Sequence, residues 1–129
     1  MTISLARVYD RGGGGGRPAF LVERLWPRGV RKEVLADVEW LKDVGPSTEL
    51  RKWFGHDPDK WDEFRRRYSA ELDAAPDAWR PLAEAAAAGD ITLLFSSHDT
   101  EHNNAVALRD YLIGRQDDAV GGQPSSLAM

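Results

Sequence analysis

The sequence contains no cysteine. Disulfide bonds, thiolate metal sites and a cysteine nucleophile are therefore excluded. It also has no apolar run that approaches the roughly 20 residues needed to cross a bilayer, and its first residues lack the apolar core of a signal peptide. We therefore expect a cytoplasmic protein that does not interact with membranes.

The chain also has no excess of basic charge. It contains 17 lysines and arginines and 21 aspartates and glutamates, for a net charge of −4. A nucleic-acid partner is disfavoured, since such proteins usually carry a basic excess. The charge is uneven, however: residues 1–32 hold seven basic and two acidic side chains. This basic segment could face an anionic ligand, or acidic helices could neutralise it.

The chain has the length and composition of one globular domain, with 129 residues, 42% of them hydrophobic. Strands are predicted within 3–10 and 19–26, which are rich in aliphatic and β-branched residues, and the apolar run 90–97 is typical of a central strand. A glycine-rich segment, 11–18, separates the first two strands. A strand follows it rather than a helix, so it indicates a surface connector and not a phosphate-binding loop. Its shortness favours a hairpin.

Helices are predicted at 45–55, 56–72, 76–89 and from about 102 to 113. Ser47 or Thr48 would cap the first and Asp57 the second. This order of elements predicts a small single-domain α/β sandwich over 1–114, with a mixed or parallel central sheet of few strands covered by helices. Residues 115–129 have no periodicity and are predicted to form a disordered tail.

The letters HDTEH, residues 98–102, resemble a zinc-protease signature with two histidines four apart. In such a protease both histidines lie on one helix, whereas His98 here follows a strand and His102 begins a helix. His56 is the remaining histidine of the chain. A metal site of His56, His98 and His102 is therefore an alternative and not the leading hypothesis, which assigns no residue as a metal ligand.

The same segment suits a ligand site better, because ligands in α/β folds gather beyond the carboxyl ends of strands. His98 would lie at the strand end, and Glu101, His102 and Asn103 would flank the helix start. The competing interpretation is structural: Asp99 or Thr100 could cap the helix and the asparagines could satisfy loop backbone.

Two further polar stretches supply candidate ligand-binding residues. In 23–32, Arg24 and Arg28 flank a Trp-Pro turn, and a guanidinium group binds two oxygens of a carboxylate or phosphate at once. Structural salt bridges are the alternative role. The stretch 40–58 adds the other candidates, Ser47, Arg51 and His56.

Three motifs, "RLWPRG", "PSTELRKWFGHDP" and "DTEHNNA", resemble the bacterial YeaO-like proteins, within the domain of unknown function 488. The resemblance covers roughly residues 3–113. It implies a compact cytoplasmic α/β protein and brings no established activity or cofactor. The sequence departs from the family's usual pattern at Glu23, where aspartate is more common, in the glycine-rich loop, and at His98, where lysine is typical. The last departure counts against a zinc site.

The leading hypothesis is an uncharacterised protein with a site for a small anionic ligand. Under this hypothesis the site could also be enzymatic. Arg24 and Arg28 would bind the anionic group, a small metabolite, and His98 or His102 would transfer a proton. The sequence implies no reaction, substrate or cofactor. A non-catalytic partner-binding or regulatory module is the alternative, and it requires exposed aromatic side chains among Trp26, Trp53, Trp61 and Trp79. The histidine metal site is the second alternative.

Overall fold

A computed structural model describes residues 2–10 and 17–115 of the chain. The strands are β1 (Ile3–Arg7), β2 (Ala19–Leu21), β3 (Val38–Trp40) and β4 (Ile91–Phe95). The α-helices are α1 (Thr48–Phe54), α2 (Trp61–Ala74) and α3 (Pro76–Ala88), and residues 104–115 form a further helix. Three short 3-10 turns are η1 (Lys32–Leu35), η2 (Lys42–Val44) and η3 (Pro58–Lys60).

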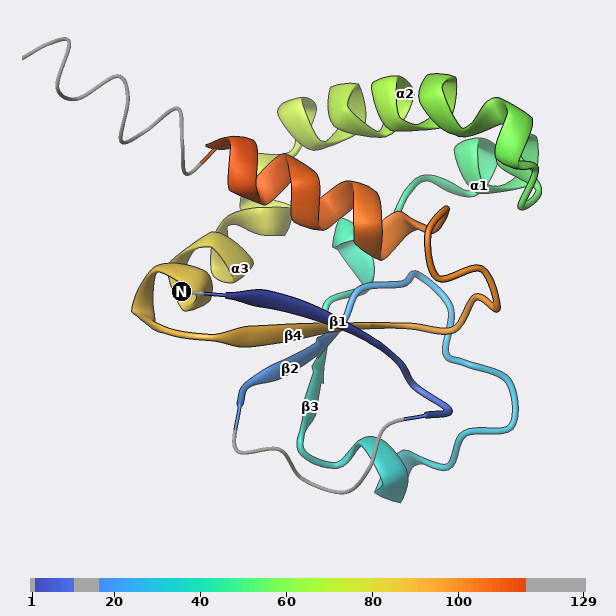
Figure 1. The fold of residues 1–129 in the computed structure, drawn as a ribbon. Coiled ribbons are helices and arrows are strands. Elements are labelled where there is room, and N and C mark those ends of the chain that lie inside the picture. Colours follow the sequence, from blue (N-terminus) through green and yellow to red (C-terminus); the bar gives the residue numbers. More distant parts are fainter. Residues whose placement is uncertain (1, 11–16, 116–129) are drawn as a thin grey trace, which may run out of the picture.

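The four strands form one parallel sheet in the order β1-β4-β2-β3 (Figure 1). Strand β4 pairs along its whole length with β1, from Ile3 opposite Ile91 to Arg7 opposite Phe95. Its other edge pairs with β2. The apolar run at 91–95 is therefore the central strand that the sequence predicts, and the α/β fold with a parallel sheet is confirmed.

The sequence left the pairing direction of the first two strands open and favoured a hairpin, which they do not form. Strands β1 and β2 are both parallel to β4, which lies between them. The physical reason is that β4 supplies hydrogen-bonding partners on both of its edges, so the two early strands need not pair with each other. The connection between them, residues 8–18, is about as long as a parallel crossover requires. Its glycine-rich part, 11–16, lies outside the described residues.

The two faces of the sheet are covered by different parts of the chain (Figure 1). On one face Phe20 and Leu93 pack in a core with the helices, among them Tyr68 of α2. On the other face Leu21 and Leu94 pack against the segment that follows β2, together with its partly buried neighbour Trp26. Since side chains alternate along a strand, β1, β2 and β4 each contribute to both cores.

Several helix ends follow the predicted capping chemistry. Ser47 Oγ accepts a hydrogen bond from Leu50 N (3.1 Å) at the start of α1, and Gly55 ends this helix in the left-handed conformation, with φ of 55°. Asp57 caps η3, which leads directly into α2. The α2 residues Phe64, Tyr68 and Leu72 are buried, and their spacing of four residues places them on one apolar face of the helix.

The chain after α3 returns through β4 to the helix at 104–115. Arg115, with which the predicted tail begins, is helical and forms an ion pair with Asp73. The rest of that tail, 116–129, lies outside the described residues. Within 2–10 and 17–115, no helix has the length and apolarity to cross a membrane.

Gly45 provides a test of how closely η2 packs against the segment after β2. A Cβ atom at this position would lie 3.0 Å from Arg24 N and 3.2 Å from Arg24 Cγ. We expect Gly45→Ala to lower the free energy of unfolding by about 1–3 kcal/mol, the usual cost of overpacking, measured by urea denaturation. Gly114→Ala is the matched control, because no atom lies within 4 Å of its added Cβ. Equal stability of both variants would contradict this packing.

Candidate functional site

Strands β2 and β4 lie side by side in parallel, so their carboxyl ends meet at one edge of the sheet. The chain leaves β2 toward one face and leaves β4 toward the other. A crevice is expected where neighbouring parallel strands diverge in this way. A cavity of about 330 Å³ lies there, which we call the inner cavity. Its lining consists of Glu23, Arg24, Leu25, Trp26, Pro27, Arg28, Pro46, Arg51, Phe54, His56, Phe64, Ser96, Ser97, Asn103 and Asn104.

A second, more open cavity of about 720 Å³ adjoins the first, and we call it the outer cavity. Arg28, His56, Ser96 and Ser97 line both cavities. The remaining lining of the outer cavity is His98 and Asp99. The two cavities therefore form one continuous site at the ends of β2 and β4.

A partly buried carboxylate joins the two loops that form the site. Glu23 Oε2 accepts a hydrogen bond from Ser96 N (3.1 Å), and Glu23 Oε1 accepts one from Ser96 Oγ (2.8 Å). Burial raises the pKa of the Glu23 carboxyl, although the bonds from Ser96 and the charges of His56 and Arg51 oppose that effect. Glu23 thus holds the end of β4 against the chain leaving β2.

The arginines of the inner cavity have no acidic partner among the described residues. Arg24 is held by its Nε atom, which donates to the carbonyl oxygens of Gly45 (3.1 Å) and Pro46 (2.7 Å). No described carboxylate forms an ion pair with Arg24, Arg28 or Arg51. Their guanidinium groups therefore bring positive charge to the cavity, and none of the three is held in an ion pair by a described carboxylate.

His56 has an unusual backbone conformation. Its φ is 59°, directly after Gly55 with φ of 55°. A left-handed conformation is uncommon for a side-chain-bearing residue and is somewhat strained. The two consecutive left-handed residues turn the chain sharply after α1 and place His56 on the wall of both cavities.

His98 lies at the mouth of the site beside a cation. Arg7 Nη2 is 3.4 Å from His98 Nδ1, and Arg7 Nε donates to Ser97 O at 2.9 Å. Because a guanidinium group can only donate, this contact favours the tautomer in which Nδ1 accepts and Nε2 carries the ring proton. His98 can therefore donate a hydrogen bond from Nε2 to a ligand in the outer cavity.

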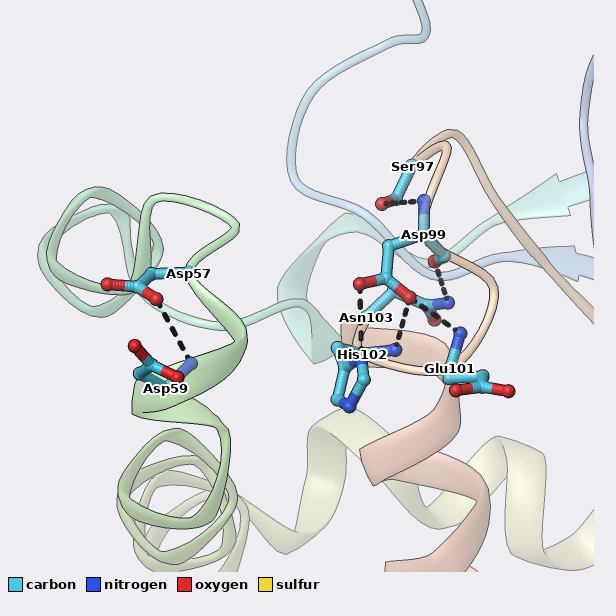
Figure 2. A network of polar contacts seen from close by, with 7 residues as sticks. All are labelled: Asp57, Asp59, Ser97, Asp99, Glu101, His102 and Asn103. Atoms are coloured by element: carbon cyan, nitrogen blue, oxygen red, sulfur yellow. Dashed lines mark hydrogen bonds and ion pairs between the residues drawn. The ribbon is translucent and has the colours of Figure 1, made fainter.

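The rest of the HDTEH segment forms a self-contained turn (Figure 2). Asp99 Oδ1 accepts from Glu101 N and His102 N, both at 2.9 Å, and Asp99 Oδ2 lies 3.0 Å from His102 Nδ1. These backbone bonds, first from Glu101 and then from His102, lower the pKa of the Asp99 carboxyl. Asn103 Oδ1 then caps the helix at Val106 N (3.1 Å).

The structure therefore divides the predicted site residues into two groups. Arg24, Arg28, Arg51, His56 and Asn103 meet at the inner cavity, and His98 lines the outer one. The three others line neither cavity: Ser47, Glu101 and His102.

Each of these three has a local environment of its own. Ser47 caps α1 and its Oγ donates to Glu71 Oε2 at 2.5 Å. The His102 ring packs edge-on against Trp61, with centroids 5.3 Å apart. Glu101 is exposed at the turn.

The sequence did not single out several residues that border the site. Trp26 lines the inner cavity, whereas the sequence suggested it only as one of the aromatic residues that a partner-binding module would expose. Asn104 also lines it while its side chain donates to Val22 O (2.7 Å). Arg7 ends β1, beside β4, and contacts the segment after β4. Only the pairing of β1 with β4 could have indicated that contact, and the sequence suggested a hairpin instead.

The geometry gives little support to the two alternative hypotheses, the histidine metal site and the partner-binding module. Within the described ranges, no group of three or more His, Asp or Glu side chains could hold a metal ion. Of the five tryptophans, Trp40 has the exposed side chain, at 38% of its accessible area. The other four are partly buried, and three of them pack against the core of the helical face.

Comparison with known proteins identifies relatives across nearly the whole chain. Residues 2–128 match the family model described as the inactive DUF488-N3 subclade. The chain is 42% identical to the uncharacterised Escherichia coli protein YeaO over 112 residues, which cover 87% of this chain and 97% of that protein. It is 36% identical to the uncharacterised Mycobacterium tuberculosis protein Rv3073c over 114 residues, 88% of this chain and 95% of that protein. No solved structure matches significantly.

Ser47 is expected to serve stability rather than binding. We predict that Ser47→Ala lowers the free energy of unfolding by about 1–2 kcal/mol through loss of the helix cap, and leaves anion affinity unchanged because Ser47 lines neither cavity. Urea denaturation and titration calorimetry measure the two effects. Thr48→Ala, at the exposed neighbouring position, is the control. A Ser47 variant of normal stability that loses anion binding would contradict this assignment.

The raised pKa of Glu23 predicts how stability depends on pH. In the unfolded chain the carboxyl ionises near its ordinary value of 4.5, but in the folded protein it ionises at a higher pH. The free energy of unfolding should therefore fall as pH rises from 4.5 through the folded-state pKa. Glu23→Gln removes this contribution, so the stability of the variant relative to wild type should increase with pH across that window. Urea denaturation at several pH values checks this, with Glu84→Gln as control; a pH-independent difference would contradict it.

Proposed function

The chain belongs to the DUF488 family, within the subclade described as inactive, and from this premise we propose that it binds a small anionic ligand without catalysing a reaction. The proposed binding site is the continuous pair of cavities at the carboxyl ends of β2 and β4. The inner cavity, at about 330 Å³, has the size of a small-molecule site.

The observation that carries this proposal is the set of three arginines around the inner cavity without an acidic partner among the described residues. Other arginines of the chain do form ion pairs with carboxylates. Arg66 Nη2 and Arg67 Nε lie 2.6 Å and 2.7 Å from Glu63 Oε2. A concave site with several unneutralised guanidinium groups attracts anions and raises their local concentration. Each guanidinium fork is shaped to bind two oxygens of a carboxylate or phosphate.

Glu23 is the one carboxylate of the inner cavity, and its contacts are compatible with anion binding. Both of its oxygens accept hydrogen bonds from Ser96 and neither forms an ion pair with a described arginine. Three arginines thus face one carboxylate in the inner cavity, and Asp99 is the carboxylate among the described residues of the outer cavity.

The placement of the histidines favours binding over catalysis. His102 is oriented by Asp99, as a general base often is, but it does not line either cavity. His98 lines the outer cavity, but its Nδ1 faces Arg7, so it is suited to donate a hydrogen bond rather than to accept a proton there. These contacts agree with the family description as inactive.

The test is the affinity for a simple anion. We expect Arg28→Ala and Arg51→Ala each to weaken pyrophosphate binding about tenfold or more, since a hydrogen bond to a charged group contributes about 1.5–3 kcal/mol. Titration calorimetry measures this at fixed ionic strength. Arg80→Ala removes an exposed arginine of α3 outside the cavities and is the matched control. Unchanged affinity in both cavity variants, or equal loss in the control, would contradict the proposed function.

A further inference from the structure

The inner and outer cavities share a wall but differ in the types of residue that line them. Six apolar residues line the inner cavity: Leu25, Trp26, Pro27, Pro46, Phe54 and Phe64. The outer cavity is lined entirely by polar or charged residues. An anion alone would need only the second kind of surface, so the inner cavity indicates that the ligand also has an apolar part.

The apolar wall includes an aromatic ring whose orientation is fixed. Trp26 Nε1 donates to Val30 O at 2.7 Å, and the indole meets the Trp40 ring edge-on with centroids 5.3 Å apart. The ring therefore does not have to be ordered when a ligand arrives. A fixed aromatic side chain on a cavity wall is suited to stacking against a planar ring.

The size of the inner cavity agrees with a ring system. An engineered cavity of about 150 Å³ holds benzene in another protein, and the inner cavity is about 330 Å³. It can therefore hold one or two fused rings. The outer cavity is larger and open, as a strongly hydrated group requires.

Cationic and donor groups lie where the two cavities meet. Arg28 and His56 line both of them, and Ser96 and Ser97 lie on the same shared wall. His98, beyond this junction, has Nε2 free to donate. A phosphate at the junction could accept hydrogen bonds from several of these groups while a ring attached to it occupies the inner cavity.

We propose that the ligand is a planar ring system joined to a phosphate, of the nucleoside monophosphate class, with the ring beside Trp26 and the phosphate between Arg28 and His98. This inference rests on the proposed function, because it assigns the anionic part of the ligand to the same arginines. The net charge of −4 favours a free nucleotide over a nucleic-acid chain, whose many phosphates the rest of the surface would repel.

The experiment compares three probes on the wild-type protein by titration calorimetry: adenosine monophosphate, adenosine and inorganic phosphate. Guanosine and cytidine monophosphates and phenyl phosphate follow as further ring-phosphates. We expect at least one nucleoside monophosphate to bind about tenfold more tightly than either inorganic phosphate or its own nucleoside. Phenyl phosphate should bind less tightly than that nucleotide, because one small ring leaves much of the inner cavity unfilled.

The Trp26 variants then test the position of the ring. Trp26→Leu should weaken nucleotide binding about fivefold or more, in proportion to the stacking of one base, and leave phosphate affinity unchanged. Trp26→Phe should restore most of the loss. Trp79→Leu, on α3 outside both cavities, is the control, and circular dichroism confirms that each variant is folded.

The outcomes separate this inference from the function on which it rests. If inorganic phosphate binds as tightly as every nucleotide and Arg28→Ala weakens it, the anion site stands and the ring assignment is wrong. If adenosine binds as tightly as its monophosphate, the anion site itself is wrong. If a single-stranded oligonucleotide binds more tightly than any free nucleotide, the ligand class is wrong. The comparison of probes on wild type decides these points even if a Trp26 variant fails to fold.

Discussion

Strand β4 hydrogen-bonds in parallel to β1 on one edge and to β2 on the other, and the positions of all the polar loops depend on this pairing. It brings the carboxyl ends of three strands to one edge of the sheet. Arg7 at the end of β1 thereby reaches the segment after β4, and Glu23 after β2 reaches Ser96. Glu23 and Ser96 are 73 residues apart in the sequence, so they meet because their strands are neighbours in the sheet.

The same pairing explains why the site combines apolar and charged surface. The chain leaves β2 toward one face and β4 toward the other, so neither segment fills the space between them. The core residues Phe54 and Phe64 form part of its lining, while Arg24 and Arg28 extend from the segment after β2. Arg24 is held by two backbone carbonyl groups rather than by a carboxylate, which leaves its positive charge available to a ligand.

Much of this could be predicted from the sequence, because the signals are local. The central strand follows from its continuous apolar run, and the caps at Ser47 and Asp57 follow from side chains that bond to nearby backbone. The pairing of β1 could not be predicted, since it depends on which distant strand lies beside it. The same limit applies to the candidate site: residue type and strand ends indicated Arg24, Arg28 and His98, but not that His102 turns toward Trp61 or that Trp26 lines a cavity.

The central claim is that anions bind among the arginines where β2 and β4 end. A nitrogen-15 NMR titration with inorganic phosphate tests this claim most directly. It follows the Nε–H signals of Arg24, Arg28 and Arg51 together with the backbone amide signals. The account predicts saturable shifts at these arginines and at Ser96, Ser97 and His98. Shifts centred on the arginines of α2, or shifts spread evenly over surface residues, would contradict it.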